Sequence, residues 1–404
     1  MDAQDIAALC AWLTTQGLKG VDELEIIDGF CGKARRAGLR LDHGVVLIDT
    51  LHPVYEGRAF IWNSERALTE VTEYGRTTEG ESADDWQRSA FFHLRENNLN
   101  ELRRRLAFGD PLDFMRLQEH LDNGQTDYVA MIHRFAPDSH IGDMDCLYSS
   151  WTTTHGEGFR ETDLEALRQL IPVLGLVVKA GALNRISRTI AEVYLGEDAA
   201  RQVLEGRMSR GKAERISAAL WFSDLQNYTR ISDNLPPDEI IPFLNDYADA
   251  VITSVHENGG TVLKLIGDGT LAIFKTDDRE QACGRALQAE RNLRERLKEL
   301  NARREQTGRP MTEVYLGLHI GDVFYGNIGS DDRLDFTVIG PAVNEVSRIA
   351  SMCRFVDRSV IMSSEFVAAA PPTRGLEVVS IGRYALRGVK RAQELFTLMS
   401  LPED

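Results

Sequence analysis

One short stretch in the C-terminal half of the sequence constrains the fold more than any other. Between residues 261 and 274 the chain reads TVLKLIGDGTLAIF, two apolar runs separated by Gly-Asp-Gly. Glycine adopts the positive φ angles that a tight turn needs, and apolar runs on both sides of such a turn are typical of paired strands. The stretch therefore predicts a β-hairpin with Asp268 in its turn.

The segments around this hairpin alternate between strand and helix patterns. Upstream lie SAALWFSDL (217–225), which has the pattern of a buried strand, and an amphipathic helix over 236–260. Downstream lie a long helix over 279–304, a strand-rich stretch over 313–329 and a further helix over 341–353. The order strand, helix, strand, strand, helix, strand is that of a ferredoxin-like α+β core.

The chain is long enough for two domains joined by a connector. Its 404 residues exceed what one hydrophobic core normally organises. We therefore predict an α+β domain over 1–160, a helical connector over 161–210 and a second α+β domain over 211–404.

The first 160 residues combine strand and helix patterns. A helix is predicted over 5–16, and the segment 83–121 is charged and helical in character. Four stretches have strand patterns bounded by turn sequences: 44–50, 58–62, 127–135 and 144–153.

Apolar residues in the connector are spaced alternately by three and four positions. A first seam and a second seam in shifted phase are formed by Leu164, Leu167, Ile171, Leu174 and Val178, and by Leu183, Ile186, Ile190 and Val193. Such seams are typical of coiled coils, and a shift in phase disturbs the supercoil. Two interpretations remain open: a parallel dimeric connector, which we prefer, and helices that pack on their own domain.

Charge and cysteine usage indicate the environment of the protein. With 46 basic and 62 acidic residues the formal net charge is −16, which disfavours nucleic acid or an anionic membrane as a partner. Five cysteines, an odd number with no CxxC pair, favour the reduced cytoplasm. We expect no membrane span and no signal peptide, and hence a cytoplasmic protein.

Two aspartates stand where predicted strands end. Asp224 closes the strand 217–225, and Asp268 lies in the hairpin turn. Read singly, Asp268 is a turn former and Asp224 a helix cap. Strands of one ferredoxin-like core lie side by side, however, so the two carboxylates can meet and hold divalent cations such as Mg²⁺.

Four ordered motifs resemble the catalytic domain of class III adenylyl and guanylyl cyclases. They are WFSDLQNYTRISD (221–233), GGTVLKLIGDGTLAIF (259–274), LGLHIGDVFYGNIG (316–329) and LDFTVIGPAVNEVSRIA (334–350). LRGVKRAQELFTL (386–398) resembles the closing hairpin of that family. The sequence departs from the family at Pro341 and Asn227, where Asp and Gly are frequent.

The resemblance implies which residues bind metal and base. Asp224 and Asp268 would bind two Mg²⁺ or Mn²⁺ ions, and Lys264 and Thr337 would contact the purine. Lysine can donate to N1 of adenine, and the threonine hydroxyl can accept from the 6-amino group, whereas guanine presents the reverse pattern. Lys264 as a plain surface charge on an edge strand is the alternative.

The resemblance also assigns residues to the ribose and the phosphates. Asn344 would orient the ribose, and Arg348 would stabilise the transition state with its guanidinium. Their spacing of four places both on one helix face, although a solvated polar face would look the same. Arg387 or Lys390 would reach the terminal phosphates.

The implied reaction converts ATP to 3′,5′-cyclic AMP and pyrophosphate, by two-metal in-line attack of the ribose 3′-hydroxyl on the α-phosphorus. In the family one subunit supplies the metal aspartates and the other the remaining residues. The resemblance therefore implies a homodimer with composite sites. A guanylate cyclase and a non-catalytic nucleotide-binding signalling protein are the alternative functions.

Residues 25–180 resemble a GAF-like sensor through DCLYSSWTT (145–153) and GFRETDLEALRQLIPVLGLVV (158–178). The resemblance implies a small molecule or cofactor as ligand of this domain. Candidate metal or haem ligands are His52, His133, His140 and His155, and candidate anchors are Cys31 and Cys146, although lone residues of these kinds are more often structural. Three aromatic residues indicate either a pocket or a core: Trp62, Tyr148 and Trp151.

Overall fold

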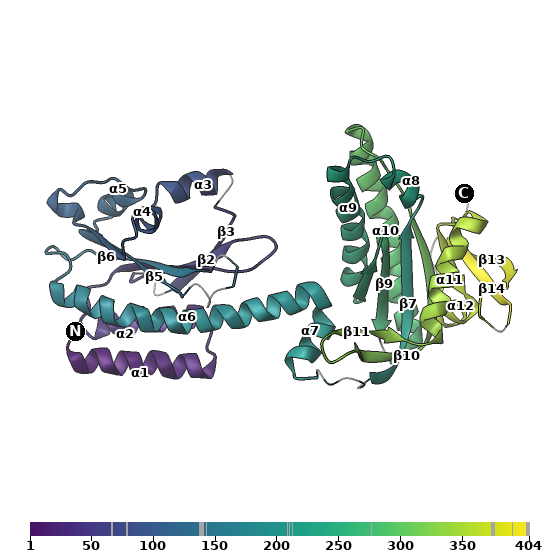
Figure 1. Ribbon diagram of the computed structural model, residues 1–404, viewed down its shortest axis with the longest axis horizontal. Coiled ribbons are helices and arrows are strands. Elements are labelled where there is room, and N and C mark those ends of the chain that lie inside the picture. The colour runs from purple at the N-terminus through teal and green to yellow at the C-terminus, as the bar shows by residue number, and fades with distance from the viewer. Residues whose placement is uncertain are drawn as a thin grey trace. The chain divides into compact units, whose positions relative to one another are not determined.

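The computed structural model describes residues 1–65, 68–77, 80–136, 141–142, 144–207, 209, 211, 213–275, 277–372, 376–389 and 391–400. The chain divides into two compact units, Met1–Ile190 and Ala191–Asp404, which are taken separately below (Figure 1).

A six-stranded antiparallel sheet forms the centre of the N-terminal unit. Its order is β3-β2-β1-β6-β5-β4. The strands are β1 His43–Asp49, β2 Gly57–Asn63, β3 Leu68–Tyr74, β4 Glu101–Arg104, β5 Asp127–Arg134 and β6 Cys146–Thr153. The four predicted strands are confirmed as β1, β2, β5 and β6.

The segment 83–121 differs from its predicted helical character. It contains α4 (Ala90–Glu96) and α5 (Leu117–Asp122), but Glu101–Arg104 is strand β4. This short charged strand pairs antiparallel with β5, so that Leu102 lies opposite Ala130 and is buried. Pairing with a neighbouring strand therefore overrides the local helical preference.

Helices cover both faces of this sheet. On one face lie α1 (Ala3–Lys19), α2 (Glu23–Arg36) and the long α6 (Glu161–Leu195), while α3 (Gly80–Gln87), α4 and α5 lie on the other (Figure 1). A 3-10 helix, η1 (Leu106–Phe108), follows β4. The larger apolar core joins α1, α2 and α6 to the sheet, and a smaller cluster lies under α4 and α5.

The first apolar seam of the connector lies inside this core. All five of its residues are buried in the N-terminal unit: Leu164, Leu167, Ile171, Leu174 and Val178. In the second seam Ile186 is buried and Val193 is 53% exposed, and α6 runs through the shift in phase without a break. A dimeric coiled coil therefore stays a prediction, for which the exposed Val193 is available in the second seam.

By length and composition, α6 is also the one helix among the described ranges that is apolar enough to cross a membrane. Half of the most apolar window of α6 is buried.

The C-terminal unit is built on an eight-stranded sheet of order β13-β14-β12-β10-β7-β9-β8, with β11 paired to β10. The strands are β7 Ala213–Leu225, β8 Thr261–Ile266, β9 Gly269–Lys275, β10 Val314–Gly329, β11 Leu334–Ile339, β12 Val360–Ser363, β13 Leu376–Tyr384 and β14 Gln393–Ser400. The helices are α7 Glu197–Leu204, α8 Tyr228–Ser232, α9 Pro237–Glu257, α10 Arg279–Gln306, α11 Pro341–Val356 and α12 Ser364–Ala369.

The succession β7, α9, β8, β9, α10, β10 confirms the ferredoxin-like order. The long helices α9 and α10 pack together on one face of the sheet (Figure 1). The other face is covered by α7, β11 and the start of α11. The hairpin is also confirmed: Ile266 pairs with Gly269, and Gly267 has a φ of 62°.

Candidate active site

The two aspartates meet at one end of the sheet. Asp224 lies near the end of β7, and β9 runs antiparallel beside it with Thr270 opposite Ser223. The tight turn before β9 brings Asp268 to the same end, within hydrogen-bonding reach of the Asp224 carboxyl. A β-carbon at position 269 would lie 3.0 Å from the Ser223 carbonyl oxygen, so glycine there permits this close approach.

The electrostatics of this pair show that the carboxyls lie close together. Desolvation of the Asp224 carboxyl, together with the hydrogen bond and the negative charge of Asp268, raises the pKa of Asp224 to about 7. Two neighbouring carboxylates repel one another when both are ionised. A divalent cation between them would remove that repulsion, and carboxylate oxygens are ligands that Mg²⁺ and Mn²⁺ prefer. The donor set therefore fits such a metal.

The base-reading candidates lie on two strands that face each other. Lys264 on β8 forms an ion pair with Asp335 on β11, and both side chains are 47% exposed. Thr337 is two residues further along β11 and therefore on the same face as Asp335. The structure thus brings the ammonium group to the strand that carries the threonine. Sequence reasoning missed Asp335, although the period of two in LDFTVIG offered the signal.

Close packing of α11 on the sheet fixes the next two candidates. The helix begins at Pro341, a position that proline favours because no intrahelical donor is lost there. A β-carbon at Gly317 of β10 would lie 2.6 Å from the Ala350 amide nitrogen, so only glycine lets the helix come this close. Asn344 is exposed and Arg348 half-buried on the helix.

The guanidinium of Arg348 lies against the loop between β13 and β14. A β-carbon at Gly388 would be 3.3 Å from both terminal nitrogens of Arg348, and Gly388 has a φ of 73°. Arg387 is the exposed residue before this glycine, on the loop that contacts Arg348. Lys390 lies outside the described residues.

A buried polar network supports α11 from behind. Nδ1 of His319 on β10 lies 2.8 Å from the Ser363 hydroxyl oxygen, and Nε2 lies 3.5 Å from a carboxylate oxygen of Glu345. Gln393 donates to the same Glu345 oxygen at 3.1 Å. Glu345 is the residue after Asn344, so three strands hold the helix at the point where it presents the candidate ribose contact. This network has no signature in the sequence.

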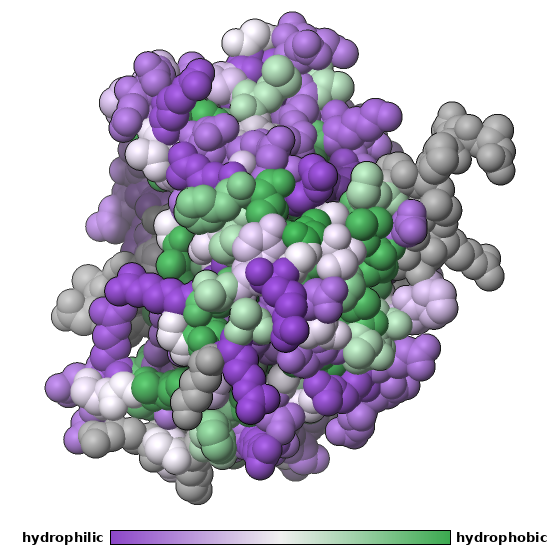
Figure 2. Space-filling model, turned by 90° about the vertical axis from the view of Figure 1, so that its right-hand side faces the viewer, coloured by the Kyte–Doolittle hydropathy of each residue, from purple (hydrophilic) through white to green (hydrophobic). Residues whose placement is uncertain are grey.

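Exposed apolar side chains accompany the site. On the edge strand β8, Leu265 is 53% and Ile266 47% exposed, directly before the Asp268 turn. On the β10–β11 hairpin, Phe324 and Ile339 pair across the strands and are about half exposed. Apolar side chains also gather among polar ones on the face of the unit that carries β13 and β14 (Figure 2). An exposed apolar edge strand is unusual in a monomer.

The sensor candidates of the N-terminal unit lie in several places. Trp62 and Trp151 are core residues, whereas Tyr148 lines a cavity. His52 stacks on Tyr55, and the described parts of the chain bring no three His, Cys, Asp or Glu side chains together as a metal cluster. The other residues of this set are partly buried His133, exposed His155, buried Cys31 and Cys146, and His140, which lies outside the described residues.

Known proteins share the C-terminal part of this chain. Residues 212–400 match the model of the adenylate and guanylate cyclase catalytic domain. Adenylate cyclase 1 of Rhizobium meliloti is 30% identical over 196 residues, which cover 46% of this chain and 29% of that protein. The adenylate cyclase of Anabaena cylindrica is 35% identical over 161 residues, or 39% of this chain and 31% of that one.

Among solved structures, the adenylyl cyclase CyaB from P. aeruginosa matches 48% of this chain and 98% of its own, with 24% identity and a TM-score of 0.43. The chain spans about 30% of the length of the curated relatives named above, so the likeness concerns this one domain.

Proposed function

Starting from a cyclase catalytic domain at residues 212–400, we propose that this chain is an adenylate cyclase that converts ATP to 3′,5′-cyclic AMP and pyrophosphate. The observation that carries the proposal is the contact between the Asp224 and Asp268 carboxyls at the end of β7. Two relatives that share this domain bear the name adenylate cyclase, which supports ATP as the substrate.

The site would hold two Mg²⁺ or Mn²⁺ ions on Asp224 and Asp268. When bound, the metal supplies Lewis-acid activation of the ribose 3′-hydroxyl and charge neutralisation at the triphosphate. The two aspartates would hold the ions in fixed positions, because β7 and the tight hairpin turn fix the aspartates themselves. Loss of either carboxylate should therefore abolish activity without unfolding the sheet.

The remaining candidates bind and orient the nucleotide. Lys264 keeps two N–H donors beside its ion pair with Asp335, and one can donate to N1 of adenine. The Thr337 hydroxyl accepts from the 6-amino group. Asn344 orients the ribose. Arg348, together with Arg387, stabilises the negative charge that develops on the phosphate oxygens.

The active form would be a homodimer with two composite sites. The exposed apolar side chains of Leu265 and Ile266 lie beside the aspartate pair on an uncovered sheet edge, where a second subunit would bury them. Each subunit would then contribute its aspartates to one site and its Lys264 and Arg348 to the other.

Nucleotide preference tests the proposal. We expect the purified chain with Mn²⁺ or Mg²⁺ to form cyclic AMP from ATP much faster than cyclic GMP from GTP. The double substitution Lys264→Glu with Thr337→Cys should shift the preference toward GTP, because glutamate can accept from N1–H of guanine. Preferred turnover of GTP by the unchanged protein would indicate a guanylate cyclase, and no turnover of either a nucleotide-binding protein.

The N-terminal part would act as a GAF-like sensor in a cytoplasmic protein, with a regulatory domain over 1–160, a dimerising connector over 161–210 and the cyclase domain over 211–404. The antiparallel sheet with a cavity on one face supports the sensor, and four buried free cysteines are compatible with a reducing compartment. Removal of residues 1–190 should change the rate or the dimer affinity; unaltered values of both would contradict regulation.

A further inference from the structure

A cavity of about 900 Å³ lies on the face of the N-terminal sheet that α6 does not cover. In β1 and β2, Val46, Ile48 and Phe60 point into the core beneath α6. Because side chains alternate along a strand, Val45, Leu47 and Ile61 point the other way and line the cavity. Organic ligands bury themselves in pockets of about 300–1,000 Å³.

Arg116 is the unusual residue of this cavity. Its φ is 67°, and the other described non-glycine residues with positive φ are Asn98, Asn227 and Asp357. Asn and Asp tolerate this conformation, whereas arginine has no local reason to adopt it. Arg116 stands before α5 without capping that helix through its side chain, so capping does not account for the strain. Such strain is concentrated at ligand sites.

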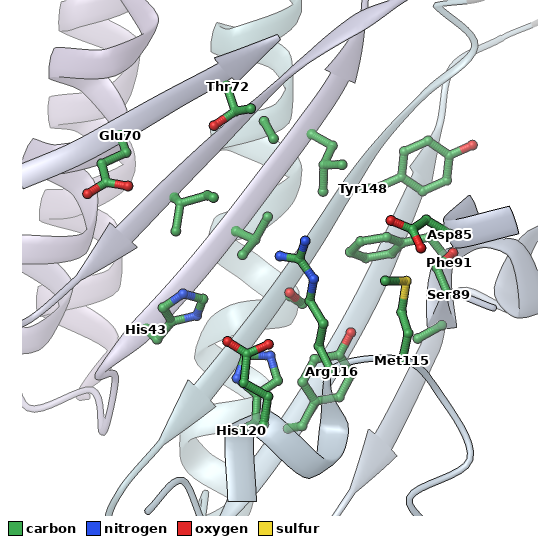
Figure 3. Close-up of a pocket in the computed structure, with 18 of the residues that line it drawn as sticks. His43, Glu70, Thr72, Asp85, Ser89, Phe91, Met115, Arg116, His120 and Tyr148 are labelled. Atoms are coloured by element: carbon green, nitrogen blue, oxygen red, sulfur yellow. The ribbon is translucent and has the colours of Figure 1, made fainter. Parts of the chain in front are cut away.

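The guanidinium of Arg116 points into the middle of the cavity (Figure 3). No ion pair or hydrogen bond joins it to another of the residues that the structure describes. Two other arginines line the cavity. Arg35 is paired with Asp42 at 3.5 Å, and Arg95 is paired with Asp145 at 3.2 Å and donates to the Tyr148 hydroxyl at 3.3 Å. Arg116 is therefore an exposed cation at the cavity, and none of the described side chains neutralises it.

Two neutral histidines lie beside this guanidinium. The rings of His43 and His120 are 5.5 Å apart, and Nδ1 of His43 is buried with no hydrogen-bond partner among the described groups. Burial, followed by electrostatic coupling to His120 and the positive charge of Arg116, lowers the pKa of His43 to about 4. A neutral ring with an unsatisfied nitrogen offers one further hydrogen bond to a ligand.

Aromatic side chains form the opposite end of the cavity. Tyr148 has Trp86 at 5.3 Å and Phe91 at 5.5 Å between ring centroids. Figure 3 shows Phe91, Met115 and Tyr148 on one side of Arg116 and His43 on the other. Flat rings pack well against such a wall.

Acidic side chains limit the charge that the cavity accepts. Seven acidic residues line it: Asp42, Asp49, Glu56, Glu65, Glu70, Asp85 and Glu119. With one unpaired arginine and these carboxylates around it, a polyphosphate would be repelled, whereas a single negative charge can be neutralised.

We propose that the cavity binds a flat aromatic carboxylate, with its carboxylate on Arg116 and its rings against Phe91 and Tyr148. A regulatory effect of such a ligand on the cyclase would depend on the sensor role proposed above. Binding itself is measured without turnover, so failure of this proposal and failure of the cyclase proposal are distinguishable.

The test uses 2-naphthoate as probe and 2-naphthamide as its neutral counterpart, titrated calorimetrically into the full chain. We expect 2-naphthoate to bind at least tenfold more tightly than 2-naphthamide. In Arg116→Gly this preference should disappear, while the melting temperature stays equal or rises because glycine relieves the positive φ.

Two further variants complete the design. Arg116→Lys keeps the charge and should retain part of the preference, and Arg36→Gln, an exposed arginine of α2 outside the cavity, should bind like the unchanged chain. Equal affinity for acid and amide, no binding of 2-naphthoate, or an unchanged preference in Arg116→Gly would each overturn the proposal.

Discussion

At the scale of single residues, burial decides which charges the N-terminal unit carries. Asp49 is 6% exposed, and its carboxylate accepts a hydrogen bond from the Tyr74 hydroxyl at 2.5 Å. Burial raises the pKa of Asp49 to about 7, although the Tyr74 hydrogen bond opposes this shift. Gly57 leaves room for Tyr74, because a β-carbon there would overlap the ring.

Asp49→Asn should stabilise the N-terminal unit at high pH. A raised pKa in the folded state means that stability is fully present below the unfolded pKa near 4 and is lost as pH rises through about 7. At pH 8 the variant should gain up to about 4 kcal/mol in the free energy of unfolding, and little at pH 4. Denaturant unfolding at both pH values checks this.

The matched control is Asp85→Asn, which removes the same charge from an exposed residue of the same cavity. It should change the free energy of unfolding by no more than about 0.5 kcal/mol at either pH. A gain by Asp49→Asn that is equal at pH 4 and pH 8 would contradict the raised pKa.

Asp335 should position Lys264 for the nucleotide. An exposed ion pair contributes up to about 1 kcal/mol, so Asp335→Asn should raise KM for ATP about two- to fivefold with kcat nearly unchanged. The melting temperature should not move. Steady-state kinetics with ATP measure the effect, and a fall in kcat at constant KM would argue against a positioning role.

At the scale of elements, α11 depends on contacts that lie far apart in the sequence. Gly317 admits the helix to the sheet, and His319 links β10 to Ser363 and Glu345. Ser363 also caps α12 by accepting from the Phe366 amide at 3.1 Å. The helix that presents Asn344 and Arg348 is therefore fixed by strands on either side of it.

Ser363→Ala should lower the free energy of unfolding of the C-terminal unit by about 1–3 kcal/mol, because it removes a helix cap and leaves buried Nδ1 of His319 without its partner. Ser364→Ala, one residue further on and partly exposed, should cost no more than about 0.5 kcal/mol. Thermal or denaturant unfolding measures the free energy of unfolding of both variants. An equal decrease in the two would mean that the buried network does not stabilise the unit.

At the scale of the whole molecule, the chain carries two units with separate cores. The described residues of one chain present the site in parts: an aspartate pair, a Lys264–Asp335 pair, and Arg348 against Gly388. Mixed dimers of two differently substituted chains can test whether these parts form one site across a dimer interface.

Asp224→Ala and Arg348→Ala should each be inactive alone, and a mixture of the two should recover activity. A mixed dimer contains one site with both substitutions and one with neither, so about a quarter of the activity of the unchanged protein is expected after random pairing. Cyclase assays on co-expressed chains with two affinity tags measure this. Absence of recovery in mixed dimers that demonstrably form would contradict composite sites.

Much of the C-terminal unit could be predicted from local patterns. The Gly-Asp-Gly turn, the strand ending at Asp224 and the amphipathic helices follow from residue spacing, which acts over a few positions. The strand at Glu101–Arg104 could not be predicted, because its stability comes from pairing with β5 rather than from its own residues. For the same reason the sequence left open whether the first seam of α6 faces a partner or its own core.

The sequence by itself determined which side chains are available for the chemistry, and the turn that carries Asp268, because turn geometry and strand alternation are local. Only the tertiary structure decided that Asp335 pairs with Lys264, that Arg348 packs against Gly388, and that Arg116 points into a cavity where no described side chain pairs with it. These contacts join residues distant in the chain, and the packing of whole elements selects them.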